Sequence, residues 1–152
     1  MEPDAIAPDG EAVLFEGYAS LFGEADLNGD IVQRGAFAAS LIRTGARGVR
    51  MLFQHDASEP VGVWDEIRED TRGLFVRGRI LQTAPRGRAA AGLVKQGAVD
   101  GLSIGFRTRR FSPRSVEGRI LLEIDLWEVS IVTFPMLPQA RLRTLKPALI
   151  AA

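Results

Sequence analysis

The sequence predicts a β-dominated α+β fold: a mostly antiparallel β-barrel, or a sandwich, of about seven short strands with two or more peripheral helices. Two observations favour this fold. About seven short apolar stretches have strand character, and two segments with helical spacing interrupt them without the alternation that a βαβ repeat requires. At 152 residues the chain is long enough for one domain with a substantial core.

The N-terminal half begins with a strand over residues 11–20, which are rich in apolar and aromatic side chains. Residues 36–43 have helical spacing, and Gly45 just after them is a typical stop signal. Residues 49–54 return to strand character. His55 follows at the end of this strand, where chemistry is commonly located.

A loop dense in turn-forming residues spans residues 23–30 and superficially resembles a calcium loop. The EF-hand pattern needs Gly at its sixth position and Glu at its twelfth. Counted from Asp26, those positions hold Ile31 and Phe37. We therefore predict a turn.

A hairpin and a second helix come next. Residues 61–67 and 74–81 alternate as the two arms of a hairpin, with a polar connection between them. Thr83 is a plausible N-cap, Pro85 suits the first helical turn, and Gly97 suits the position just after the helix.

The last strands cover residues 101–108, 119–124 and 126–134, and Pro135 ends the third of them. Along residues 126–134 we expect Trp127, Val129 and Ile131 on one face and Glu128 and Ser130 on the other. We predict a flexible N-terminal segment (1–10), a folded domain (11–140) and a C-terminal tail (141–152).

Composition narrows the classes of partner and of site. Nineteen basic residues balance nineteen acidic ones, so no net charge favours nucleic acid or an anionic membrane. No cysteine is present, and no apolar run approaches the length of a membrane span, so we expect a soluble, intracellular protein. Because His55 is the one histidine, zinc motifs with several histidines or cysteines are excluded, and we expect neither metal nor cofactor.

The most informative motif is a serine between two glycines, Gly101-Leu102-Ser103-Ile104-Gly105. It matches the nucleophile elbow of α/β-hydrolases, but that fold needs a histidine after the serine and a helix after the turn. Here the histidine precedes the serine, and the strand pattern continues. We therefore expect Ser103 on a flat strand, paired with His55 as nucleophile and base, with the two glycines clearing space for an extended peptide.

An acid that orients the imidazole would complete such a site. Glu128 is the preferred candidate because it lies within an otherwise apolar strand, and Asp56 and Asp125 are alternatives. Each residue also has a purely structural interpretation. Ser103 would then be a small residue in a crowded strand, His55 a hydrogen-bonded residue at a strand end, and Glu128 a surface glutamate.

Taken in order, these stretches resemble the prohead maturation proteases of tailed phages, a serine protease family with a fold like that of the herpesvirus assemblins. The matching residues are Gly17-Tyr18-Ala19-Ser20, Asp30, Gly35-Ala36-Phe37, Phe53-Gln54-His55-Asp56, Pro60-Val61-Gly62, the serine motif with Phe106, and Glu128-Val129-Ser130-Ile131-Val132-Thr133-Phe134-Pro135. They run from about residue 17 to residue 140, nearly the whole chain.

The resemblance implies that His55 and Ser103 are catalytic and that Glu128 is the third member. Assemblins use a second histidine, which this chain lacks, so an acid must serve or the site is a dyad. Assemblins also stabilise the oxyanion with help from adjacent arginines. Here Arg141 and Arg143 are not adjacent, so we assign no oxyanion hole.

The implied activity is an endopeptidase that removes scaffold segments from the major capsid protein and processes itself inside an assembling prohead in the bacterial host. A homodimer or higher oligomer fits this picture, without nucleic acid or membrane partners. Two rival interpretations remain: a non-catalytic scaffolding protein that retains the protease fold, and a hydrolase of small esters.

Overall fold

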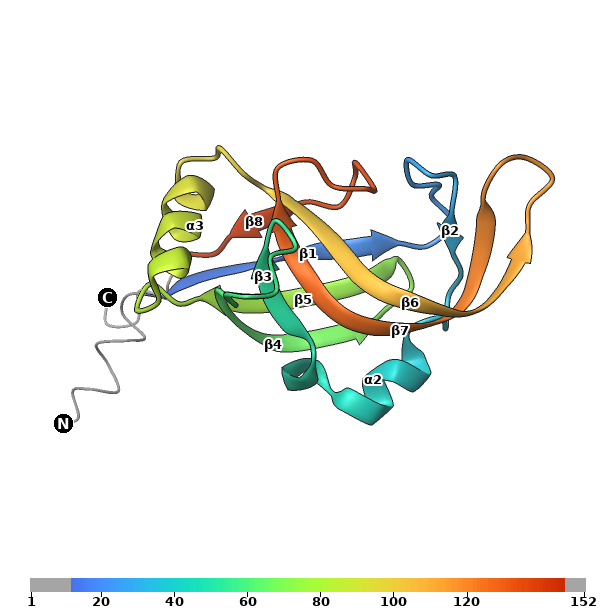
Figure 1. The fold of residues 1–152 in the computed structure, drawn as a ribbon, viewed down its shortest axis with the longest axis horizontal. Coiled ribbons are helices and arrows are strands. Elements are labelled where there is room, and N and C mark those ends of the chain that lie inside the picture. Colours follow the sequence, from blue (N-terminus) through green and yellow to red (C-terminus); the bar gives the residue numbers. More distant parts are fainter. Residues whose placement is uncertain (1–11, 147–152) are drawn as a thin grey trace.

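The computed structural model describes residues 12–146, which form one mixed sheet with two α-helices and a short 3₁₀ helix (Figure 1). In chain order the elements are β1 (Val13–Leu21), β2 (Ile31–Val32), α2 (Ala38–Thr44), η1 (Ala46–Gly48), β3 (Arg50–Phe53), β4 (Gly62–Glu69), β5 (Gly73–Ile80), α3 (Pro85–Lys95), β6 (Gly101–Pro113), β7 (Arg119–Val132) and β8 (Leu142–Thr144). No helix among the described residues is long and apolar enough to cross a membrane.

Strand β7 lies at the centre of the site-bearing part of the sheet. The strand order is β2-β7-β3-β4-β5-β1-β8, and β6 also pairs with β7. β6 and β7 form a long antiparallel hairpin, whereas β2 and β3 lie parallel to β7. β3 meets the C-terminal half of β7, with Arg50 opposite Glu128 and Phe53 opposite Ile131.

The expected β-dominated fold with two helices is confirmed, but the expected barrel is wrong because the sheet does not close. Closure would need a strand along the free edge of β6. β8 is three residues long and pairs with β1, and the chain beside it reaches β6 only through an isolated bridge between Arg141 and Gly101. Within residues 12–146, this edge of β6 has no strand partner from Ser103 onward.

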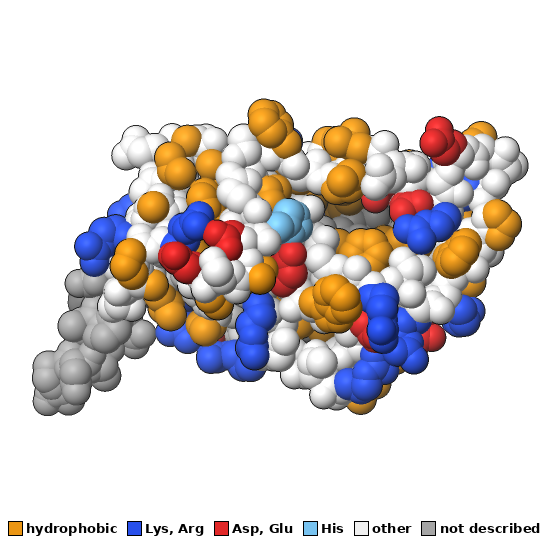
Figure 2. Space-filling view, viewed as in Figure 1, with side chains coloured by type: hydrophobic (Ala, Val, Ile, Leu, Met, Phe, Trp, Pro, Cys, Tyr) orange, Lys and Arg blue, Asp and Glu red, His pale blue; other side chains and the backbone are white. Residues whose placement is uncertain are grey.

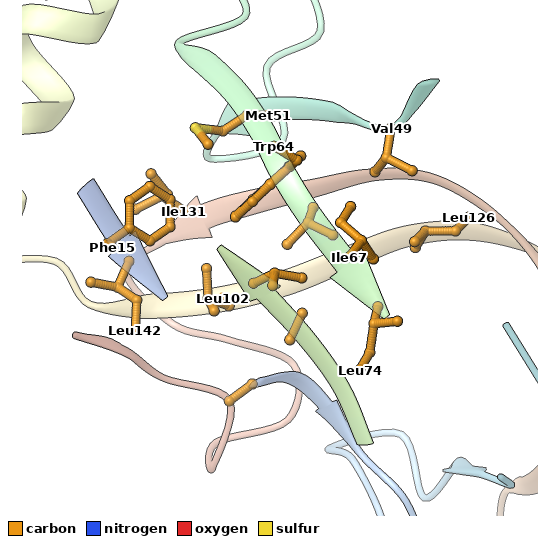
Figure 3. Packing of buried hydrophobic residues seen from close by; sticks show 14 of the residues in the cluster. Phe15, Val49, Met51, Trp64, Ile67, Leu74, Leu102, Leu126, Ile131 and Leu142 are labelled. Carbon is orange, nitrogen blue, oxygen red and sulfur yellow. The ribbon is translucent and has the colours of Figure 1, made fainter. Parts of the chain in front are cut away.

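The core lies on one face of the curved sheet and gathers aromatic and aliphatic side chains from β1, β3, β4, β5, β6 and β7 (Figure 3). The Phe15 and Trp64 rings pack edge to face with centroids 5.3 Å apart, and both side chains are fully buried. Leu102 and Ile131 pack into the same core. Core packing therefore holds β6 against β7 at the level of the serine motif.

A β-bulge in β7 changes which face of the sheet its side chains point to. The register shifts between Gly105 and Phe106, which pair with Glu128 and Leu126, and Trp127 is the extra residue on β7. Leu126 and Val129 both reach the core, whereas Trp127 is 57% exposed. The expectation that Trp127 shares a face with Val129 is therefore wrong, because regular alternation fails at a bulge.

The other observed elements differ from the predicted ones mainly at their ends. The hairpin forms as β4 and β5, and Gly97 follows α3 with a positive φ of 76° as expected. Thr83 is not the N-cap: Ala84 takes that position without a side-chain hydrogen bond. The expected flexible N-terminal segment lies outside the described residues, as does the tail after residue 146. Residues 142–144 of the expected tail form β8.

Candidate active site

His55 is presented by an unusual turn at the end of β3. Gln54 and His55 have φ values of 55° and 60°, a left-handed conformation that costs on the order of 1–3 kcal/mol for a residue other than glycine. Hydrogen bonds to the end of β7 hold both residues in place. The Gln54 N–H donates to the Ile131 carbonyl (2.9 Å), and the His55 N–H donates to Ser130 Oγ (3.1 Å).

The Gln54 side chain fastens the same turn a second time. Its Nε2 donates to Thr133 Oγ1 (2.6 Å), and its Oε1 accepts the Thr133 backbone N–H (3.1 Å). A strained turn persists only where its surroundings over-determine it, and here the last residues of β7 and the residue after it do so. The position of His55 is therefore set by β7.

Glu128 contacts the imidazole directly. His55 Nδ1 lies 2.6 Å from Glu128 Oε2, and the two side chains are 43% and 14% exposed. The hydrogen bond to Glu128 raises the pKa of His55 above its ordinary value, against the opposing effect of burial. Because Nδ1 faces the carboxylate, Nε2 is the nitrogen available to a further partner.

Ser103 is buried, lies opposite Ser130 in the β6–β7 ladder, and lines the same pocket as His55. The structure therefore places Ser103 and His55 on the walls of one pocket and sets Glu128 against the imidazole. Within residues 12–146, the Ser103 hydroxyl forms no hydrogen bond with His55 or with another group. A serine hydroxyl beside an imidazole fixed by a carboxylate can perform nucleophilic acyl transfer.

The two glycines of the motif have a different role from the predicted one. A Cβ at Gly105 would lie 2.6 Å from Glu128 Cδ, and a Cβ at Gly101 would lie 2.7 Å from the Pro135 ring. Both values are too short for real contacts. Atoms of the chain itself occupy this space, so the expectation that the glycines clear room for a peptide is wrong.

The pocket beside His55 and Ser103 has a volume of about 200 Å³ and mixed walls. Figure 2 shows the histidine beside a hollow with hydrophobic side chains around it. Apolar side chains form much of the lining: Leu102, Ile104, Phe106, Leu121, Met136 and Leu137. The loop at residues 24–30 contributes Glu24, Asp26, Asn28 and Asp30 to the polar wall, so the site combines an apolar surface with a charged rim.

That loop is the predicted turn. Asp26 Oδ1 accepts the N–H groups of Asn28 (2.8 Å) and Asp30 (3.0 Å), as in an Asx turn. Asp30 is buried and pairs with Arg119 (2.8 Å), whose hydrogen bonds hold the pKa of Asp30 below its usual value. Among the described residues, no group of three or more His, Asp or Glu side chains is arranged to hold a metal ion.

The alternative acids are engaged elsewhere. Asp56 accepts hydrogen bonds from Ser58 and pairs with Arg86 at 2.6 Å. Asp125 pairs with three arginines: Arg43, Arg107 and Arg109. Of the three candidate acids, all within the described part of the chain, only Glu128 contacts the imidazole.

The arginines after β7 form separate ion pairs. Arg141 pairs with Asp100 at 2.8 Å, and Arg143 pairs with Glu16. We assign no oxyanion role to either residue.

Sequence reasoning missed the contribution of Ser130. It is fully buried and hydrogen-bonded to both Glu128 and the His55 backbone. Its position two residues after Glu128 was the available signal, because alternate residues of a strand share a face. The Gln54–Thr133 pair carried no comparable signal, since the two residues are far apart in the sequence.

The sequence of this chain is similar to those of known phage proteins. The model of the caudovirus prohead serine protease family matches residues 2–149. The prohead protease of Enterobacteria phage HK97 is 41% identical over 144 residues, a match that covers 91% of this chain and 62% of that protein. The capsid polyprotein of Pseudomonas phage PAJU2 is 31% identical over 106 residues, which cover 64% of this chain and 16% of that protein. The chain thus spans less than two thirds of either relative.

Solved structures share the fold at low identity. The capsid assembly protease of bacteriophage T4 superposes with a TM-score of 0.60 at 15% identity, covering 78% of this chain and 80% of that one. The KSHV protease, solved with a hexapeptide phosphonate inhibitor, superposes with a TM-score of 0.59 at 13% identity, covering 90% of this chain and 66% of that one. These likenesses support the fold alone. The family model, which matches nearly the whole sequence, confirms the resemblance: the chain belongs to the caudovirus prohead serine protease family.

Proposed function

We propose that this chain is a serine endopeptidase that removes scaffold segments from the major capsid protein of a phage or phage-like head, and that it also processes itself. The observation that carries the proposal is the 2.6 Å hydrogen bond between His55 Nδ1 and Glu128 Oε2, beside the pocket that Ser103 lines. The names of the HK97 and PAJU2 relatives support capsid protein as the substrate.

In the proposed mechanism, His55 Nε2 accepts the proton of Ser103 Oγ as the oxygen attacks a peptide carbonyl. The imidazolium then donates this proton to the leaving amine, and an acyl-enzyme remains. Water, deprotonated by the same nitrogen, releases the acid and regenerates the serine. Glu128 maintains the tautomer with the proton on Nδ1 and stabilises the charged ring, consistent with the raised pKa of His55.

The substrate would bind as an extra strand. Among the described residues, β6 has no strand partner on one edge from Ser103 onward, so its backbone N–H and C=O groups are available there. A peptide laid along this edge would bring its carbonyl to the serine and its side chains to the largely apolar pocket. Confinement within a prohead in the host would raise the local concentration of both partners.

The direct test is to co-express the protein with its capsid protein and follow removal of the scaffold segment by gel. Ser103→Ala should abolish processing, since loss of a serine nucleophile costs on the order of 10⁶-fold. Ser112→Ala, at the far end of the same strand, is the matched control and should leave processing intact. Undiminished processing by Ser103→Ala would contradict the proposal.

A fluorophosphonate probe separates an enzyme from a scaffold that only retains the fold. It should label the wild type at Ser103 and should not label Ser103→Ala. A protein that remains unlabelled while it assembles normal heads would favour the scaffolding interpretation. Turnover of nitrophenyl esters without capsid processing would favour the ester hydrolase.

A further inference from the structure

We propose that Ser130 is a positioning residue of this site, whose hydroxyl ties the Glu128 carboxylate to the backbone of the turn that carries His55. The inference deepens the proposed function and rests on the catalytic use of His55 and Ser103. Ser130 would not touch the substrate. It would act through the two residues that orient the base.

The hydrogen bonds of Ser130 fix the direction of its proton. Ser130 Oγ lies 2.6 Å from Glu128 Oε1, and the His55 N–H lies 3.1 Å from the same Oγ. A carboxylate only accepts, so the hydroxyl donates to Glu128 and accepts from His55. Ser130 is fully buried, so water does not compete for these bonds.

These bonds close a ring that begins and ends on His55. The backbone N–H donates to Ser130, Ser130 donates to Glu128 Oε1, and Glu128 Oε2 holds His55 Nδ1. Each carboxylate oxygen therefore has one partner within the ring. The imidazole is thus held in a defined position relative to its own backbone, and a carboxylate with only one of these bonds would retain more rotational freedom.

The ring is also aligned with the nucleophile. Ser103 lies directly opposite Ser130 across the β6–β7 ladder. This one cross-strand pair therefore positions both the proposed nucleophile and the ring of hydrogen bonds that orients His55. Small errors in such geometry are costly, because a displacement of about 1 Å can reduce a rate by about 10²-fold. Loss of the Ser130 hydroxyl should therefore reduce processing without removing any reacting group.

A buried serine of helix α2 that is hydrogen-bonded to β7 provides the matched control. Ser40 is 2% exposed, and its Oγ accepts the N–H of Leu126 at 2.9 Å. Ser40→Ala removes a buried hydroxyl that accepts a backbone N–H, as Ser130→Ala does, without a bond to Glu128 or His55. Any effect that arises only from lost stability should appear in both variants.

The readout independent of proteolysis is the pKa of His55, measured by NMR titration of the single imidazole in the chain. In Ser130→Ala we expect this pKa to fall toward its ordinary value, because the released carboxylate spends time away from Nδ1. Processing should fall by about 10²-fold. Ser40→Ala should keep the wild-type pKa and near wild-type processing.

A second variant guards against failure of Ser130→Ala to fold. Ser130→Cys keeps the approximate shape but substitutes a weak donor and acceptor, so both effects should appear in the same direction and be smaller. A folded Ser130→Cys or Ser130→Ala with the wild-type pKa of His55 and wild-type processing would overturn the inference. Equal losses in Ser40→Ala and Ser130→Ala would also overturn it.

Failure of the proposed function has a different signature. If Ser103→Ala processes capsid protein normally while Ser130→Ala still lowers the pKa of His55, the hydrogen-bonded ring exists but the protease proposal is wrong. If Ser103→Ala abolishes processing while Ser130→Ala changes neither readout, the protease proposal stands and the role of Ser130 is refuted.

Discussion

Gly105 lies directly opposite Glu128 in the β6–β7 ladder, and a Cβ at residue 105 would come within 2.7 Å of Glu128 Cγ. The glutamate side chain occupies the space beside the glycine and meets His55 Nδ1 through its carboxylate. The second glycine of the serine motif therefore leaves room for the Glu128 side chain, and does not provide access to Ser103. This relationship leads to the first prediction.

Gly105→Ala should disable the site while it largely preserves the fold. The three atoms nearest to the added methyl group would all belong to the side chain of Glu128, which can rotate away, so the main cost should be loss of the contact with His55. We expect a lower pKa of His55 by NMR and at least about 10²-fold slower processing. Gly92→Ala, in α3 with open space around it, should leave both unchanged and stabilise the protein by up to about 1 kcal/mol. Wild-type processing by Gly105→Ala would contradict this role of the glycine.

Glu128→Gln should lower and shift the pH profile of processing. The neutral imidazole is the base, so activity rises as pH increases through the pKa of His55, which Glu128 raises. Removal of the charge should move this rise to lower pH and reduce the plateau by roughly 10²- to 10⁴-fold, because the tautomer and the imidazolium lose support. Rates of capsid cleavage across pH 5–9 test both effects. A profile that keeps its wild-type midpoint would refute the role of Glu128.

Asp56→Asn and Asp125→Asn should leave processing near the wild-type level. Both carboxylates bond to groups other than His55: Asp56 to Ser58 and Arg86, and Asp125 to a cluster of arginines. Assays of capsid processing by Asp56→Asn, Asp125→Asn and Glu128→Gln, run side by side, test this prediction. If Asp56→Asn loses activity and Glu128→Gln does not, Asp56 has the orienting role.

The Asp30–Arg119 pair should contribute stability that depends on pH. Hydrogen bonds from Arg119 lower the folded-state pKa of Asp30, so its contribution is present above the unfolded pKa of about 3.9 and is lost as pH falls through the folded value. Asp30→Asn should reduce the free energy of unfolding at pH 7 by about 1–3 kcal/mol and flatten its decline in acid. Urea unfolding at neutral and acidic pH measures both quantities. Asp100→Asn, which removes an exposed pair, should change little, and an equal loss there would contradict the prediction.

Local patterns in the sequence were sufficient for much of the architecture. The alternation along β4 and β5, the turn at residues 23–30 and the glycine after α3 each depend on neighbouring residues, so they could be predicted without knowledge of the fold. The single histidine and the serine between two glycines could be chosen as site candidates for the same reason. The count of histidines and one short motif were enough to select His55 and Ser103 as candidate site residues.

Only the tertiary structure decided which acid reaches the histidine, what the glycines accommodate and whether the sheet closes. The parallel pairing of β3 with β7 brings the turn at His55 beside Ser130 and Glu128, and a slip of one residue would turn both side chains away. The free edge of β6 depends equally on the short β8. Such pairings join residues that are distant in the chain, and their register is set by the packing of the whole core.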